Sequence, residues 1–105
     1  MTAEEREILI ERMTDNLPIF RKKLKLSQER LASFIGSSRY TVMQIESKKR
    51  KMTWNTFLSL VLLFDKNEET ALLLRVLKIY TEDFDQLLTR PTGGVPGRSQ
   101  KEEAQ

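Results

Sequence analysis

The chain has 105 residues, which fits one domain of ordinary size with a modest helical core. It contains neither cysteine nor histidine, which excludes disulfides, thiolate nucleophiles and the familiar zinc sites. The first sixteen residues carry five acids, unlike a signal peptide, and no apolar run approaches the roughly 18 residues of a membrane helix. We therefore expect a cytoplasmic protein with no membrane partner, no metal and no cofactor.

The net charge of +3 is unevenly distributed along the chain. Residues 17–64 hold ten bases and two acids, whereas residues 1–16 and residues 65–89 each carry a net charge of −3. A basic block on a mildly basic domain is typical of nucleic-acid binders. Charge alone leaves a second interpretation open, in which the bases form an ordinary solvated surface.

Apolar residues recur at helical spacing along most of the chain, without a strand pattern. Helices are expected at about 3–13, 17–25, 28–35, 38–47, 54–64 and 68–80, with a short addition over 82–89. The break near residues 15–16 rests on Asp15, Asn16 and Pro18, which favour the start of a new helix. The sequence therefore predicts an all-α fold, a compact bundle of five to six helices.

Spacing also predicts which faces of these helices are buried. The expected buried residues are Leu31, Phe34 and Ile35 in the 28–35 helix, and Leu72, Leu73, Val76, Leu77 and Tyr80 in the 68–80 helix. Leu74 is expected to point elsewhere. The 54–64 helix is apolar nearly all round, which predicts a central position, contact with a partner subunit, or both.

The chain divides into four expected segments. Residues 1–16 form an accessory helix, residues 17–80 form the main domain, and residues 81–90 form a short extension. Residues 91–105, PTGGVPGRSQKEEAQ, are rich in proline, glycine and polar residues, so we expect a disordered tail.

The stretch 27–46, SQERLASFIGSSRYTVMQIE, predicts two short helices joined by a tight turn. Gly36 allows the chain to turn sharply, and Ala32 is small where the two helices cross. Val42 and Ile45 share one face and anchor the second helix on the core. This pattern is a helix-turn-helix signature, whose outward face can enter the major groove of DNA.

Residues 17–64 resemble the phage-repressor (Cro-like, Xre-type) helix-turn-helix domains of bacteria and phage. The resemblance rests on LSQERLASFIGSSRYTVMQIES, followed by KKRKMTWNTFLSLVLLF. The matching positions are Leu26, Ser27, Gln28, Leu31, Ala32, Gly36, Ser38, Val42, Ile45, Glu46 and Thr53. The family often has glycine where Lys48 stands and proline where Met52 stands. Since lysine is strained in a left-handed cap, we expect the loop to close differently here.

The resemblance implies a lambda-repressor-like domain that binds double-stranded operator DNA, and we expect it to regulate transcription as a repressor. A homodimer is expected from the surplus apolar surface of the 54–64 and 68–80 helices and from the additional N-terminal helix. The residues implied to face base edges are Arg39, Tyr40, Gln44 and Met43. The alternative for the first three is an ordinary solvated helix face, and the alternative for Met43 is packing. The residues implied to contact the DNA backbone are Gln28, Ser38, Lys48, Lys49, Arg50 and Lys51. Glu46 is expected to be structural, Gln28 has simple capping as its alternative, and Trp54 is expected in the core or at a hinge.

A second hypothesis is an antitoxin or accessory subunit whose main ligand is another protein. The acidic N-terminal helix or residues 65–89 would form its surface, and DNA binding would serve autoregulation. An enzyme is not expected, because no His or Cys supplies a nucleophile and base pair. The acidic clusters lie on expected solvated faces: Glu68, Glu69, Glu82, Asp83 and Asp85.

Overall fold

The computed structural model describes residues 1–91, and within that range it contains six helices and no strand. The helices are α1 (Ala3–Lys23), α2 (Gln28–Ile35), α3 (Arg39–Glu46), α4 (Trp54–Asp65), α5 (Glu68–Val76) and α6 (Glu82–Thr89). The all-helical prediction is confirmed over this range. The expected tail lies outside it, apart from its first residue. Among the described helices, none has the length and apolar character needed to cross a bilayer.

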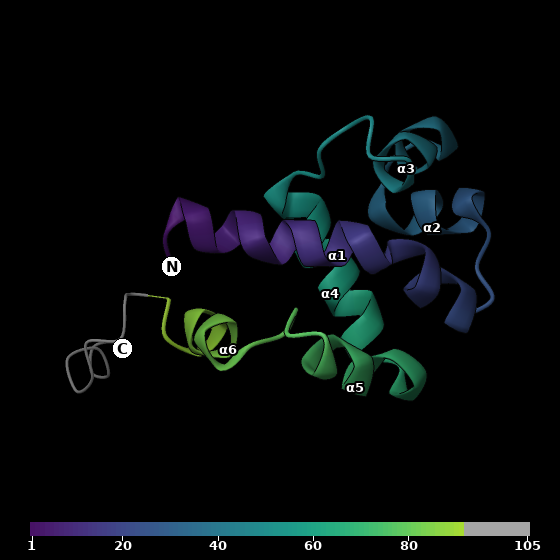
Figure 1. Ribbon diagram of the computed structural model, residues 1–105. Helices are drawn as coiled ribbons and strands as arrows, with labels where there is room; N and C mark the ends of the chain where they lie inside the picture. The colour runs from purple at the N-terminus through teal and green to yellow at the C-terminus, as the bar shows by residue number, and fades with distance from the viewer. Residues whose placement is uncertain (92–105) are drawn as a thin grey trace, which may run out of the picture.

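Figure 1 shows α1 running along most of the molecule. α2 and α3 lie near the C-terminal end of α1, and α5 and α6 lie below α1 in this view. α4 crosses α1 and packs against α1, α2 and α5. Phe20 of α1 stacks on Phe64 of α4, with ring centroids 4.8 Å apart. The predicted central position of the 54–64 helix is therefore confirmed, although Leu62 on its outer side is 58% exposed.

α1 is one continuous helix, so the expected break near residues 15–16 is wrong. The proposed boundary between the accessory helix and the main domain falls inside it. Pro18 in a helix interior costs about 3 kcal/mol. The unbroken helix buries five large apolar side chains: Leu9, Ile10, Met13, Leu17 and Phe20. Because each contributes about 1.5–3 kcal/mol, this burial outweighs the cost of the proline.

α5 ends at Val76 rather than near residue 80, and its expected buried face is partly wrong. Leu72 and Val76 are 69% and 63% exposed, whereas Leu74 is fully buried. The buried hydroxyl of Thr70, one turn before Leu74, donates to the Phe64 carbonyl over 2.6 Å. This hydrogen bond helps to set the rotation of α5, because leaving the buried hydroxyl unpaired would be costly.

Other predicted burials are partly corrected as well. Phe34 was expected in the core, but it is 48% exposed, because α2 turns Leu31 and Ala32 inward instead. The expected extension over 82–89 is present as α6, which buries Phe84. The Phe84 ring meets Phe57 edge to face, with centroids 5.7 Å apart, which fixes α6 on α4.

Three helices end on a lysine with positive φ, a conformation that usually selects glycine. The residues are Lys25 (φ 57°), Lys48 (φ 64°) and Lys78 (φ 59°). After α5, the Lys78 N–H donates to the Arg75 carbonyl and the Ile79 N–H to the Leu74 carbonyl, over 3.0 and 2.8 Å. These are the two bonds of a Schellman cap. The caps pair carbonyls that the helix ends leave open, at the cost of left-handed strain.

We predict that Lys78→Gly raises the free energy of unfolding by about 1 kcal/mol, because glycine removes the strain of the left-handed backbone. Lys66→Gly is the matched control, since Lys66 has a right-handed backbone with φ −79°. That change should lower stability by about 0.5–1 kcal/mol. Urea unfolding of both variants measures the two shifts, and a shift of the same sign in both would contradict the strain argument.

Candidate nucleic-acid interface

The stretch 27–46 forms the two expected short helices. The Ser27 side chain accepts from the Arg30 N–H at the start of α2, and the Ser38 side chain accepts from the Thr41 N–H at the start of α3. Gly36 ends α2 in the left-handed conformation, with φ 69°. The two predicted helices and the glycine turn are thus confirmed, and α3 is one residue shorter at each end than expected.

α3 has an inward and an outward face. Val42 and Ile45 are 1% and 2% exposed, so they anchor the helix on the core as expected. Arg39, Tyr40 and Met43 are exposed on the opposite side. The structure therefore brings three of the four predicted base-reading residues onto one open surface, and the fourth, Gln44, is half-buried beside them.

Glu46 joins three helices through one carboxylate. The Arg21 guanidinium of α1 donates to it twice, from Nε over 2.7 Å and from Nη2 over 3.1 Å. The Gln28 amide of α2 donates to the same carboxylate over 3.0 Å. The side chains of Arg21 and Glu46 are only 13% and 8% exposed. Glu46 is thus structural, as expected, and its position holds α3 against α1 and α2.

The role expected for Gln28 changes accordingly. Ser27 is the cap of α2, which rules out simple capping by Gln28. The Gln28 side chain instead reaches α3 and contacts Glu46. A phosphate contact at this helix N-terminus would therefore use the backbone amides there, or the part of the Gln28 amide that Glu46 does not occupy.

A second hydrogen-bond network covers the outward side of α3. Gln44 donates to the Tyr40 hydroxyl over 2.8 Å and accepts from Arg50 Nε over 3.1 Å. Arg50 Nη1 also approaches the Thr41 hydroxyl at 3.5 Å, a long contact. Arg50, predicted as a backbone contact, thus lies with the predicted base-reading residues. The Arg39 side chain makes no hydrogen bond or ion pair with any residue in 1–91.

The loop after α3 closes through Lys48, and here the sequence prediction is wrong. Lys48 adopts the left-handed conformation that glycine would take, with φ 64°. Its N–H donates to the Ile45 carbonyl over 3.0 Å, and the Lys49 N–H donates to the Gln44 carbonyl over 2.8 Å. The lysine therefore closes the helix as glycine would, because the two cap bonds offset the backbone strain.

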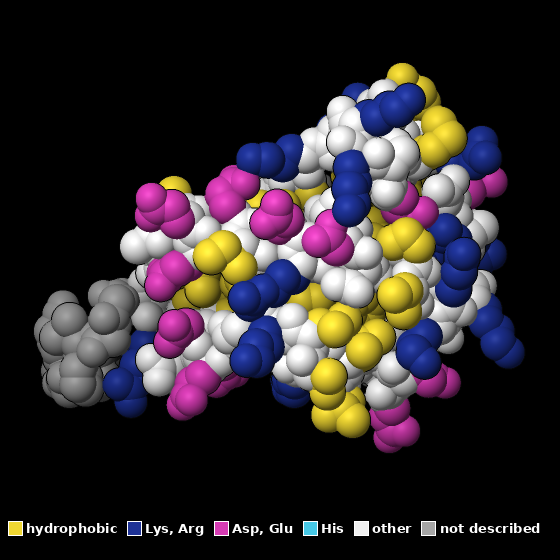
Figure 2. All heavy atoms as spheres, in the orientation of Figure 1, with side chains coloured by type: hydrophobic (Ala, Val, Ile, Leu, Met, Phe, Trp, Pro, Cys, Tyr) yellow, Lys and Arg dark blue, Asp and Glu magenta, His cyan; other side chains and the backbone are white. Residues whose placement is uncertain are grey.

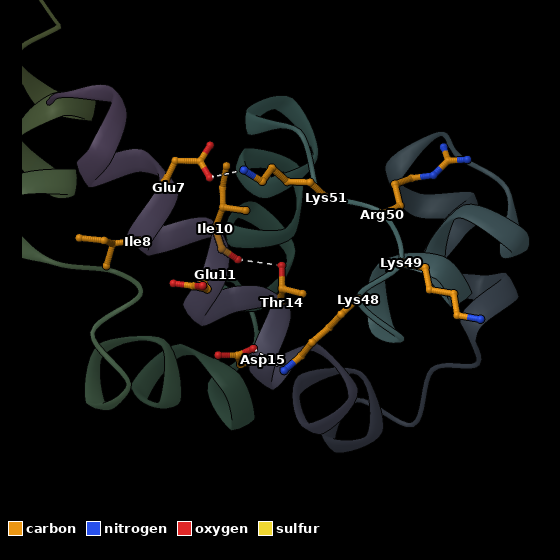
Figure 3. A pocket seen from close by; sticks show the side chains of 10 residues that line it. All are labelled: Glu7, Ile8, Ile10, Glu11, Thr14, Asp15, Lys48, Lys49, Arg50 and Lys51. Atoms are coloured by element: carbon orange, nitrogen blue, oxygen red, sulfur yellow. Dashed lines mark hydrogen bonds and ion pairs between the residues drawn. The ribbon is translucent and has the colours of Figure 1, made fainter.

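The basic side chains of this loop point two ways (Figure 3). Lys48 Nζ lies 2.8 Å from Asp15 and Lys51 Nζ lies 2.6 Å from Glu7, so both lysines are paired with α1. The hydrogen bond and negative charge of Asp15 raise the pKa of Lys48, and those of Glu7 raise the pKa of Lys51. Lys49 and Arg50 point away from α1.

An open groove of about 610 Å³ separates the loop from α1. Its charged walls are Glu7, Glu11 and Asp15 on one side and Lys48, Lys49, Arg50 and Lys51 on the other. Figure 2 shows acidic side chains along the N-terminal part of α1 and basic side chains over α3. Residues 1–91 contain no group of three Asp or Glu placed to hold a metal ion.

Two features of the site were missed by the sequence prediction. No role was predicted for Arg21, and Glu7, Glu11 and Asp15 were not related to the loop. The i, i+4, i+8 spacing of these acids predicts a shared helix face. Only the packing of the loop on α1 shows what that face meets.

Comparisons of this chain with protein-family models, with curated proteins and with solved structures give no match. The resemblance to Cro-like domains therefore rests on the sequence motif, and the candidate interface rests on the geometry described above.

We predict that Glu46→Ala lowers the free energy of unfolding by about 2–3 kcal/mol, because it leaves the largely buried Arg21 charge without its partner. Asp65→Ala is the matched control. It removes the Asp65–Arg75 pair, whose side chains are 36% and 44% exposed, and should cost less than about 1 kcal/mol. Equal losses in urea unfolding would show that the Glu46 network does not hold α3.

Proposed function

We propose that this chain is a sequence-specific DNA-binding transcriptional regulator, a repressor of the phage-repressor (Cro-like) type. In this proposal α2 and α3 form the helix-turn-helix, and α3 is the recognition helix that enters the major groove of operator DNA. The observation that carries the proposal is that α3 has one face buried on the core and one face exposed. Val42, Ile45 and Glu46 attach its inner side to the core and to α1, while Arg39, Tyr40 and Met43 are exposed on its outer side.

The dimensions of the partners support this assignment. An α-helix with its side chains is about 10–12 Å across, and the major groove is about 12 Å wide. α3 lies at one end of the molecule, where Figure 1 shows it at the surface, with the loop beside it. Such a helix can approach a duplex without a clash from α5 or α6. The arrangement fits the lambda-repressor-like fold that the motif implies.

The outward side chains of α3 supply the chemistry for reading bases. In the proposed complex Arg39 pairs with guanine, Gln44 pairs with adenine, and Tyr40 and Met43 meet apolar edges such as the thymine methyl. Arg50 is added to the proposed base-reading residues, because its guanidinium donates a hydrogen bond to the Gln44 side chain. The network among Tyr40, Gln44 and Arg50 already restricts these side chains in the free protein. Less side-chain entropy is then lost when they bind DNA.

Backbone contacts surround this reading face. Ser38 and the first amides of α3, together with Gln28 and the first amides of α2, lie at helix N-termini, which attract phosphates. Lys49 extends from the loop away from α1 and adds a sequence-independent contact. Lys48 and Lys51 contact phosphate only after leaving their acidic partners.

A homodimer is part of the proposal, with half-sites about 34 Å apart on a near-palindromic operator. Exposed apolar side chains on the packed pair α4 and α5 support it: Leu62, Leu72 and Val76. Figure 2 shows hydrophobic side chains gathered over α5. The same surface could instead bind a different protein, if the chain is an antitoxin or accessory subunit. A homodimer in solution favours the regulator, and a monomer favours the subunit of another protein.

To test the reading face, duplexes that bind the protein are first selected from a random pool. We predict that Arg39→Ala or Gln44→Ala weakens binding to the selected duplex about tenfold to a hundredfold, with little effect on random duplex. Lys49→Ala should weaken binding to the selected and the random duplex equally. The slope of log affinity against log salt concentration should become shallower by about 0.9, the value for one phosphate contact. Equal losses on both duplexes for Arg39→Ala and Gln44→Ala would show that these residues do not read bases.

To test the dimer, sedimentation is measured at high micromolar concentration for the wild type and for Leu72→Lys/Val76→Lys. We expect a wild-type dimer that the two lysines convert into a monomer, because they place charge in the apolar contact. Leu88→Lys, at an exposed position on α6, is the control and should leave the dimer intact. A wild-type monomer that still bound the selected duplex tightly would refute the homodimer.

A further inference from the structure

An acidic edge on α1, made of Glu7, Glu11 and Asp15, faces the basic loop that follows the recognition helix. Two of its three carboxylates hold loop lysines, Glu7 with Lys51 and Asp15 with Lys48. Glu11 lies between them on the same wall of the groove, and its charge acts on both lysines. Half of the basic side chains in the loop therefore have an intramolecular anion in place.

These ion pairs are exchangeable. The Lys48 and Lys51 side chains are 62% and 70% exposed, and pairs with this exposure hold weakly. A DNA phosphate can displace the carboxylate, but the released carboxylates then remain as unpaired negative charges beside the loop. They repel any phosphate that lies within the Debye length, which is about 8 Å at physiological salt.

We propose that the acidic edge of α1 is an autoinhibitory contact, which competes with DNA phosphates for Lys48 and Lys51 and so limits the affinity for any duplex. This inference rests on the proposed DNA-binding function. The wild-type loop then contacts the DNA backbone mainly through Lys49. Sequence choice depends more on α3, because the sequence-independent contribution of the loop is reduced.

The test compares two variants with the same change in net charge. Glu7→Gln/Glu11→Gln/Asp15→Asn neutralises the acidic edge, and Glu68→Gln/Glu69→Gln/Glu82→Gln neutralises three exposed acids on α5 and α6. Binding of both to random duplex DNA is followed by fluorescence anisotropy over a salt series. Circular dichroism and thermal unfolding establish that each variant is folded.

We expect the edge variant to bind random duplex at least about tenfold more tightly than the control variant. The slope of log affinity against log salt concentration should be steeper by about two. Two more lysines then contact phosphates, and each contact releases about 0.9 counterions from the DNA. Adding Lys48→Ala and Lys51→Ala to the edge variant should remove the gain.

Other outcomes overturn the proposal in different ways. Equal binding by the edge and control variants means that only net charge matters, and weaker binding by the folded edge variant means that the ion pairs position the loop for DNA. In both cases the protein still binds DNA, so the proposed function stands while the autoinhibitory contact does not. If neither the wild type nor any variant binds duplex DNA, both proposals fail.

Discussion

The position of α3 depends on a carboxylate shared between helices. An eight-residue helix is too short to be stable alone, so α3 exists only through its contacts. Val42 and Ile45 bury its apolar side, but apolar contacts alone would leave its rotation loosely specified. The Glu46 carboxylate adds directional bonds to Arg21 and Gln28, which fix the helix against α1 and α2. The direction of its outward face, and with it the proposed DNA-reading surface, follows from that constraint.

α1 carries out two tasks on different faces. Its apolar face forms a large part of the core, and Arg21 near its end supports α3. Its acidic face lies beside the basic loop and holds Lys48 and Lys51. These tasks require a helix that continues through Pro18, since a break near residue 16 would uncouple the acidic half from the half that packs on α3. The same helix therefore positions the proposed DNA-binding surface and moderates its charge.

The helix ends show how local sequence and tertiary context share control. Ser27, Ser38 and Thr53 cap their helices through local contacts alone, because a side-chain oxygen can pair an open N–H without any help from other elements. The left-handed lysines are different. Lys48 and Lys78 adopt a conformation that their own side chains disfavour, and only the surrounding cap bonds and packing explain it.

The amino-acid sequence alone was enough to predict the all-helical fold, the limits of α2 and the anchoring of α3 by Val42 and Ile45. Those features follow from spacing and capping within a few residues. Tertiary contacts set the continuity of α1 through Pro18, the rotation of α5, the two partners of Glu46 and the direction of each loop lysine. These depend on which surfaces meet across distant parts of the chain. Helical periodicity specifies the faces of a helix, but not which element each face contacts.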